Sequence, residues 1–293
     1  MLFTSKLAKE PFAKDPAVEK LGDKYFFYYS VFFEDTLGIG IAYSEDCENW
    51  QEYGRFPVTQ ECEMSGVGAP GAIVRDGVLH LFYQTYGTGK KDALCHAWSV
   101  DGLHFEKDPS NPVFRPTRDW CCGRAIDADI CKFKDRYYLY FATRDHEMRM
   151  QKLGAAWTDA DSDFSRESWT QVCAHSILAP EMQWEQECIE APATIVDRDK
   201  LYLFYGGAYN RKPQQIGCAV SEDGIHFERL SAEPFLKNGK PGSWNAEESG
   251  HPYAFRDTDG RAWLFYQGND GTTWRITKAE LTFSENGPVI SNE

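Results

Sequence analysis

Three carboxylates stand at related places in a repeated sequence pattern. Asp15, Asp127 and Glu190 lie at the heads of short apolar segments, in KDPAV, IDADI and IEAPA. Two further segments of the same type carry Ala69 and His251 at the head. Carboxylates that face one another raise each other's pKa, so that one can hold a proton while another stays ionised. Cleavage of a glycosidic bond requires such a combination of one carboxylic acid and one carboxylate.

The segments behind these heads form a fivefold repeat. Equivalent positions at Pro16, Pro70, Ala128, Pro192 and Pro252 are 54 to 64 residues apart. In each unit a turn leads from the apolar segment to an aromatic one: YFFYYS, LHLFYQ, YYLYFA, LYLFYG and AWLFYQ. A third segment with small residues follows in four units, and the fifth unit has only the weaker TWRITKAE there. Four short strands per unit and five units predict an all-β fold, a five-bladed β-propeller with four-stranded antiparallel blades.

The repeat predicts a single domain over residues 1–293. The expected blades are 11–54, 65–108, 123–169, 186–230 and 248–283. The first strand of each blade of a propeller lines the central axis, so the five head residues should converge on one end of the channel. Charges at that place cost desolvation energy, which a purely structural channel would avoid with apolar side chains. A β-sandwich also has many short strands, but it does not predict five equivalent openings.

The openings resemble those of glycoside hydrolase family 43, whose members are five-bladed propeller glycosidases related to families 32, 62, 68 and 117. The resemblance covers residues 11–283. It implies that Asp15, in an Asp-Pro pair, is the general base, and that Glu190, in Glu-Ala-Pro, is the general acid. It further implies that Asp127 tunes the pKa of the acid and orients it, although Ala128 stands where the family has proline. The nucleophile motif of family 32 is not matched around Asp15.

Two residues are candidates for an axial metal site. The resemblance places His251, in a Gly-His pair, near an axial cation or water cluster. Asp129 lies two residues after Asp127, so on a strand it shares the same face and projects into the channel. These two residues could hold a structural Ca²⁺, although a water-filled channel and a buried hydrogen bond of Asp129 are the alternatives. We expect no cofactor to be required.

Further residues near the predicted strand ends are candidates for binding the substrate. Charged groups of the third blade could contact sugar hydroxyls, and aromatic rings could form a stacking wall at the rim of the pocket. Solvated loops and core packing are the alternative roles for these side chains. The candidates are Phe32, Trp120, Arg124, Arg144, His146 and His251.

The composition limits partners and location. A formal net charge of −14 argues against nucleic acid or an anionic membrane surface as partner. No uncharged apolar run reaches the roughly 18 residues of a membrane span. The start of the chain has no signal-peptide pattern, which leads us to expect a cytoplasmic protein. The nine irregularly spaced cysteines fit buried, reduced thiols.

These features predict a glycoside hydrolase, inverting and exo-acting on small glycosides such as α-L-arabinofuranosides or β-xylosides. A retaining fructosidase-like or anhydro-sugar-specific enzyme, or a propeller that binds carbohydrate without cleaving it, are the alternatives. The expected partner is a small oligosaccharide or glycoside, and the sequence does not determine the oligomeric state. Asp15 and Glu190 come from opposite sides of the ring, so we expect a carboxyl separation of about 6.5–9.5 Å, which is typical of inverting enzymes.

Overall fold

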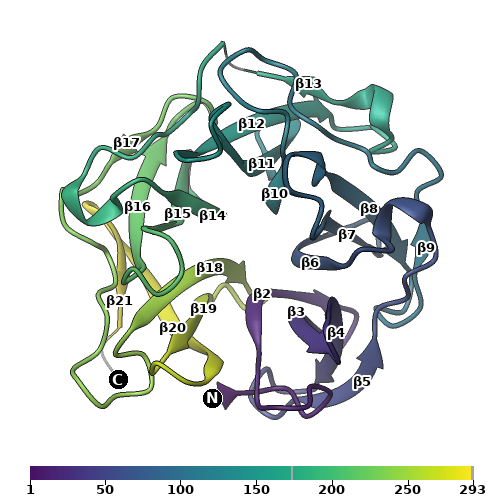
Figure 1. Cartoon of the computed structure of the whole chain (residues 1–293), viewed down its shortest axis with the longest axis horizontal. Helices are drawn as coiled ribbons and strands as arrows, with labels where there is room; N and C mark the ends of the chain where they lie inside the picture. Colours follow the sequence, from purple (N-terminus) through teal and green to yellow (C-terminus); the bar gives the residue numbers. More distant parts are fainter. Residues whose placement is uncertain (173, 292–293) are drawn as a thin grey trace.

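The computed structural model describes residues 1–172 and 174–291, so the prediction of a reduced thiol at Cys173 lies outside it. Five antiparallel sheets are arranged around a common centre, with the strands β2, β6, β10, β14 and β18 innermost (Figure 1). Four short 3-10 helices accompany the strands of these residues. The prediction of an all-β, five-bladed propeller is therefore confirmed.

The first four blades each contain four strands in chain order from the centre outward. The first blade consists of β2 (Lys14–Leu21), β3 (Lys24–Phe33), β4 (Thr36–Ser44) and β5 (Gln51–Arg55). The second consists of β6 (Val67–Arg75), β7 (Val78–Thr85), β8 (Leu94–Ser99) and β9 (Glu106–Lys107). The third consists of β10 (Ile126–Phe133), β11 (Arg136–Arg144), β12 (Gln151–Asp159) and β13 (Thr170–Gln171). The fourth consists of β14 (Ile189–Asp197), β15 (Lys200–Gly207), β16 (Gln215–Ser221) and β17 (Glu228–Arg229).

The fifth blade is completed by the other end of the chain. Its inner strands are β18 (Glu248–Arg256), β19 (Ala262–Asn269) and β20 (Trp274–Ser284). Both β1 (Leu2–Phe3) and β21 (Gly287–Ile290) pair with β20. The N-terminal strand thus closes the ring, a pairing that the sequence pattern of the fifth unit did not predict.

The aromatic segments form the core of each blade as second strands. Tyr29, Phe141 and Tyr205 are almost completely buried there. Small residues of the third strands lie in register with these rings: a Cβ added at Gly40 would come within 2.5 Å of the ring of Tyr29, and one added at Gly217 would come within 2.3 Å of the ring of Tyr205. The glycines of the third strands therefore make room for aromatic rings of the same sheet.

Each inner strand begins with the same irregular backbone. The residues at the head positions have positive φ angles between 39° and 53°, and the strand register shifts at each of them. They are Asp15, Ala69, Asp127, Ala191 and His251. A non-glycine residue held in this conformation costs about 1–3 kcal/mol, and such residues cluster at functional sites.

The acid of the fourth blade occupies a different place in the pattern. Ala191 has the positive φ angle, so Glu190 lies one residue earlier, at the position that Lys14 occupies in the first blade. The acid and the lysine both belong to the regular, paired part of their strands, before the bulge.

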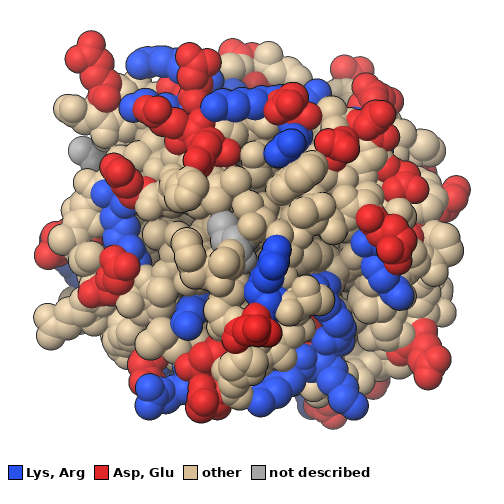
Figure 2. Space-filling model, turned by 90° about the horizontal axis from the view of Figure 1, so that it is seen from above, with Lys and Arg blue, Asp and Glu red and all other residues tan. Residues whose placement is uncertain are grey.

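The surface of the ring carries both charges. Lys and Arg are intermixed with Asp and Glu over the edge that Figure 2 displays. None of the helices in the described residues has the length and apolar character needed to cross a membrane.

Candidate active site

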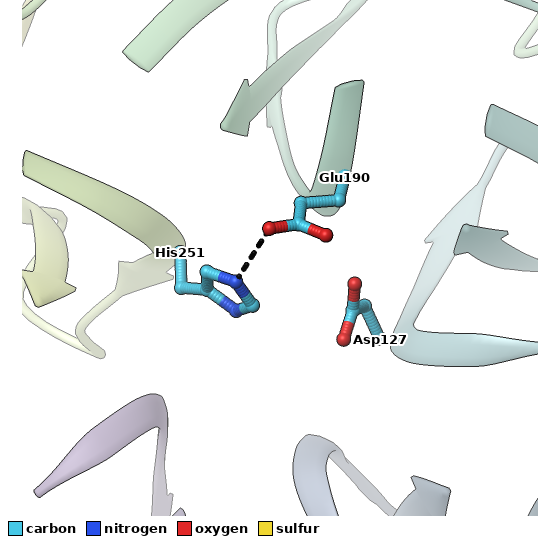
Figure 3. Close-up of side chains that lie close together, drawn as sticks. All are labelled: Asp127, Glu190 and His251. Carbon is cyan, nitrogen blue, oxygen red and sulfur yellow. Dashed lines mark hydrogen bonds and ion pairs between the residues drawn. The ribbon is translucent and has the colours of Figure 1, made fainter. Parts of the chain in front are cut away.

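The head positions surround one end of the channel, as predicted. Asp15, Asp127 and His251 line a small axial cavity together with the residues that follow them. The side chains of Asp127, Glu190 and His251 come from three different blades and point toward one another (Figure 3). All three are buried, with at most 6% of their surface exposed.

His251 lies between two carboxylates. Its Nδ1 is 2.8 Å from Asp15 Oδ1, and its Nε2 is 3.2 Å from Glu190 Oε1. Asp15 Oδ1 has no aligned hydrogen bond among the described residues, so the shorter contact is an ion pair. Burial alone would lower the pKa of His251, but the two carboxylates outweigh it and raise this pKa well above 6.5. The ring is therefore an imidazolium with one N–H on the side of each acid.

Asp15 is held in its ionised form. Burial opposes the charge, but the positive charges of His251 and Lys14 lower the pKa of Asp15 well below its usual range. The Nζ of Lys14 donates a hydrogen bond to Asn210 Oδ1 at 2.9 Å and lies over the ring of Trp274. A buried carboxylate beside two cations stays charged at neutral pH.

Glu190 accepts hydrogen bonds from four side chains. They are Gln214 (2.7 Å), Asn210 and His251 (both 3.2 Å) and, at short distance, Gln151. Burial would raise the pKa of Glu190, but the hydrogen bond and charge of His251 and the amide of Gln214 lower it. Donors to the charged form favour that form, so Glu190 rests as a carboxylate.

Asp127 holds the proton more readily than Glu190. Burial is the largest cause that raises the pKa of Asp127 to about 6; His251 opposes the rise, and the charges of Glu190 and Asp15 add to it. Its Oδ2 accepts a hydrogen bond from the backbone N–H of Ala191 at 3.3 Å. As the predicted general acid, Glu190 is expected to hold the proton, with its pKa tuned by Asp127. The pKa shifts have the opposite order, because the amide and imidazole donors gather around Glu190.

The channel does not offer a good calcium site among the described residues. Asp129 Oδ2 accepts hydrogen bonds from the backbone and hydroxyl of Thr194 at 3.1 and 2.5 Å, and burial raises the pKa of Asp129 to about 7. The acidic and imidazole groups that approach within 4.8 Å of one another are Asp127, Glu190 and His251. Ca²⁺ prefers six to eight oxygen ligands, whereas this group offers two carboxylates and one imidazole and does not include the predicted ligand Asp129. These residues therefore do not fit the predicted ion.

The two candidate arginines, Arg124 and Arg144, bind a glutamine that in turn binds Glu190. Gln151 Oε1 accepts hydrogen bonds from Arg144 Nε at 2.7 Å and from Arg124 at 3.4 Å. Arg124 also forms an ion pair with Asp92 at 3.3 Å, and the guanidinium of Arg144 lies over the ring of Tyr209. Both arginines thus contact a glutamine that binds Glu190, and their proposed contacts with sugar hydroxyls stay predictions.

The other candidates lie in different surroundings. Phe32 packs edge-to-face on Phe12, and Trp120 packs against the core between the second and third blades. His146 is exposed and its Nε2 lies 2.7 Å from the backbone oxygen of Asp119. Their proposed contacts with a sugar stay predictions.

The sequence analysis did not identify the glutamine side chains that bind the backbone of the head residues. Gln267 and Gln84 accept hydrogen bonds from the backbone N–H groups of Asp15 and Asp127. Both glutamines end an aromatic segment of the neighbouring blade, in LFYQ, and this repeated position was the available signal. Gln214 had no such signal, because it follows the second strand of its blade.

The comparisons with known proteins identify the family and the fold. The sequence model of glycosyl hydrolases family 43 matches residues 9–284. The fold is similar to the crystal structure of a thermostable family-43 glycoside hydrolase, with a TM-score of 0.77, 18% identity and coverage of 99% of this chain and 96% of the other. It is also similar to an α-L-arabinofuranosidase from Lactobacillus brevis, with a TM-score of 0.72, 15% identity and coverage of 99% and 96%.

Two curated relatives are phosphorylases of Thermoanaerobacter sp. (strain X514). A β-1,2-mannobiose phosphorylase is 30% identical over 40% of this chain, and the matched part spans 42% of that protein. A 1,2-β-oligomannan phosphorylase is 25% identical over 71% of this chain and 68% of its own length. The family match over nearly the whole chain is the broader finding: the chain belongs to glycosyl hydrolase family 43 and is a glycosidase that acts on O-glycosyl bonds.

Proposed function

We propose that this enzyme hydrolyses small glycosides from their non-reducing end with inversion at the anomeric carbon. The observation that carries the proposal is the approach of Asp15 and Glu190 to one imidazole ring from opposite sides. The imidazole ring of His251 and its contact on each side separate the two carboxylates. This arrangement supports the wide carboxyl separation of inverting enzymes over the separation of about 5–5.5 Å in retaining enzymes.

In the proposed reaction Asp15 accepts a proton from the attacking water, and Glu190 donates a proton to the departing oxygen. Glu190 must therefore be protonated when it acts. Asp127, whose pKa is about 6, is the nearest store for that proton, because their carboxylate oxygens lie within 4.8 Å of each other. A glycosidic oxygen can only accept a hydrogen bond, so its arrival beside Glu190 favours transfer of the proton from Asp127.

A second assignment within the same chemistry makes Asp127 the acid itself. Leaving-group dependence separates the two assignments, because a good leaving group needs no protonation. The variant of the true acid, Glu190→Gln or Asp127→Asn, should keep much more activity on a 2,4-dinitrophenyl glycoside than on a 4-methylumbelliferyl glycoside.

The experiment that tests the proposal is a panel of nitrophenyl glycosides, followed by NMR of the first product anomer. The panel contains α-L-arabinofuranoside and β-D-xyloside, which we propose as the substrate type, and β-D-mannoside, which the relatives suggest. Hydrolysis with inverted product supports the proposal. A product of retained configuration would assign the enzyme to the fructosidase-like alternative, and binding without turnover would favour the carbohydrate-binding propeller.

A second candidate function is phosphorolysis of a β-1,2-mannoside. It is favoured by the two relatives and by the guanidinium of Arg144, which has no carboxylate partner among the described ion pairs. In this reaction phosphate attacks the anomeric carbon and the products are a sugar 1-phosphate and a free sugar. Incubation of β-1,2-mannobiose with and without inorganic phosphate distinguishes the two acceptors, since only phosphorolysis gives mannose 1-phosphate.

A further inference from the structure

Gln151 connects two arginines to Glu190. It is the first residue of β12, and its side chain is completely buried. Its Oε1 accepts from Arg144 and Arg124, while its Nε2 donates to Glu190 Oε2. The amide therefore has a cationic donor on one side and a carboxylate on the other.

The arginines determine which way this amide points. A guanidinium has donors and no acceptor, so it must face the oxygen of the amide. The NH₂ group is then directed at Glu190, which can accept it. If the amide turned over, its oxygen would face the carboxylate and its NH₂ group would face the arginines, and both contacts would be lost.

We propose that Gln151 is a positioning residue for Glu190, and that Arg144 acts on the reaction through Gln151 instead of binding the sugar. This inference rests on the proposed role of Glu190. Arg144 is assigned as the main anchor because its Nε contact with Gln151 is 2.7 Å, compared with 3.4 Å for Arg124. The fixed amide keeps Glu190 Oε2 in one place, while Glu190 Oε1 accepts hydrogen bonds from Gln214, Asn210 and His251.

The test is a double-mutant cycle with Gln151→Met and Arg144→Met. Methionine keeps most of the volume of both side chains and removes their polar atoms. Loss of an oriented hydrogen bond to a charged group should lower kcat about 10- to 100-fold with little change in KM. If Arg144 acts through Gln151, the double variant should be no slower than Gln151→Met alone, since effects along one connection are not additive.

Arg149→Met is the matched control. Arg149 is an exposed cation close in the chain that forms an ion pair with Glu187 at 3.3 Å. It should leave kcat and KM unchanged. Thermal unfolding of all variants checks that the fold is retained, and crystal structures of wild type and Arg144→Met show whether the contact between Gln151 and Glu190 depends on the arginine.

The outcomes separate this inference from the proposed function. Additive losses, or a rise of KM at constant kcat in Arg144→Met, would show that the arginine binds substrate directly and would overturn the inference. An unmoved Gln151 amide and Glu190 carboxylate in Arg144→Met would overturn it as well. Full activity of Glu190→Gln would instead overturn the proposed function, and the crystal structures would still decide whether Arg144 orients Gln151.

Discussion

Replacement of His251 by glutamine removes the positive charge between Asp15 and Glu190 and should destabilise the fold. At an effective dielectric constant of about 20, a unit charge pair at 2.8 Å contributes about 6 kcal/mol and a pair at 3.2 Å about 5 kcal/mol. Desolvation of the buried ions offsets several kcal/mol of this attraction. We expect a net loss of about 3–5 kcal/mol, because the variant leaves two buried carboxylates without their cation.

Surface histidines provide matched controls for this variant. His104 and His226 form ion pairs with Asp101 and Asp223 at 2.7 and 2.6 Å, but their side chains are 72% and 79% exposed. The same substitution there should cost at most about 1 kcal/mol, because water screens the charges. Each kcal/mol of lost stability lowers the unfolding temperature by about 2–4 °C. We therefore expect the unfolding temperature to decrease by roughly 6–20 °C for His251→Gln and by a few degrees for the controls.

The pH dependence follows from the two pKa shifts. The raised pKa of His251 contributes stability that is complete below about 6.5 and is lost as the pH rises through its higher, folded-state pKa. The lowered pKa of Asp15 contributes stability above about 3.9 that is lost as the pH falls. The difference between wild type and His251→Gln should therefore be large near pH 6–7 and decrease toward pH 3. A loss at pH 7 no larger than that of His104→Gln would refute an imidazolium between the two acids.

Three further predictions concern activity. Asp15→Asn and Glu190→Gln should each lower kcat by about 10²- to 10⁴-fold in a protein that still folds, and normal turnover of either would remove that residue from the mechanism. Wild-type kcat/KM should decline as the pH rises above about 6, the pKa of Asp127, and Asp127→Asn should abolish this limb; an unmoved limb would show that another group titrates. Dialysis against EDTA should change neither activity nor unfolding temperature, because His251 is engaged by two carboxylates, and restoration of lost activity by added Ca²⁺ would contradict this reading.

Much of the fold follows from local patterns in the chain. Alternation and aromatic content predict the strands, and the regular spacing of Pro16, Pro70 and their equivalents predicts five sheets around an axis. The closing strand Leu2–Phe3 could not be predicted, because two residues have no period of their own and acquire their place only by pairing with Thr277 and Ile276.

The groups that face the channel could be predicted from the chain alone. Asp15, Asp127 and His251 sit at the same step of a repeat, and Glu190 sits one residue away, so any propeller built from these segments brings them to one end of the axis. Their charges, in contrast, depend on the folded arrangement. A pKa depends on burial and on neighbours within a few ångströms, and several of these neighbours come from other blades: His251 beside Asp15, and Gln151 beside Glu190. For this reason the pKa of Asp127 is raised and that of Glu190 is lowered, an order that no spacing along the chain could have revealed.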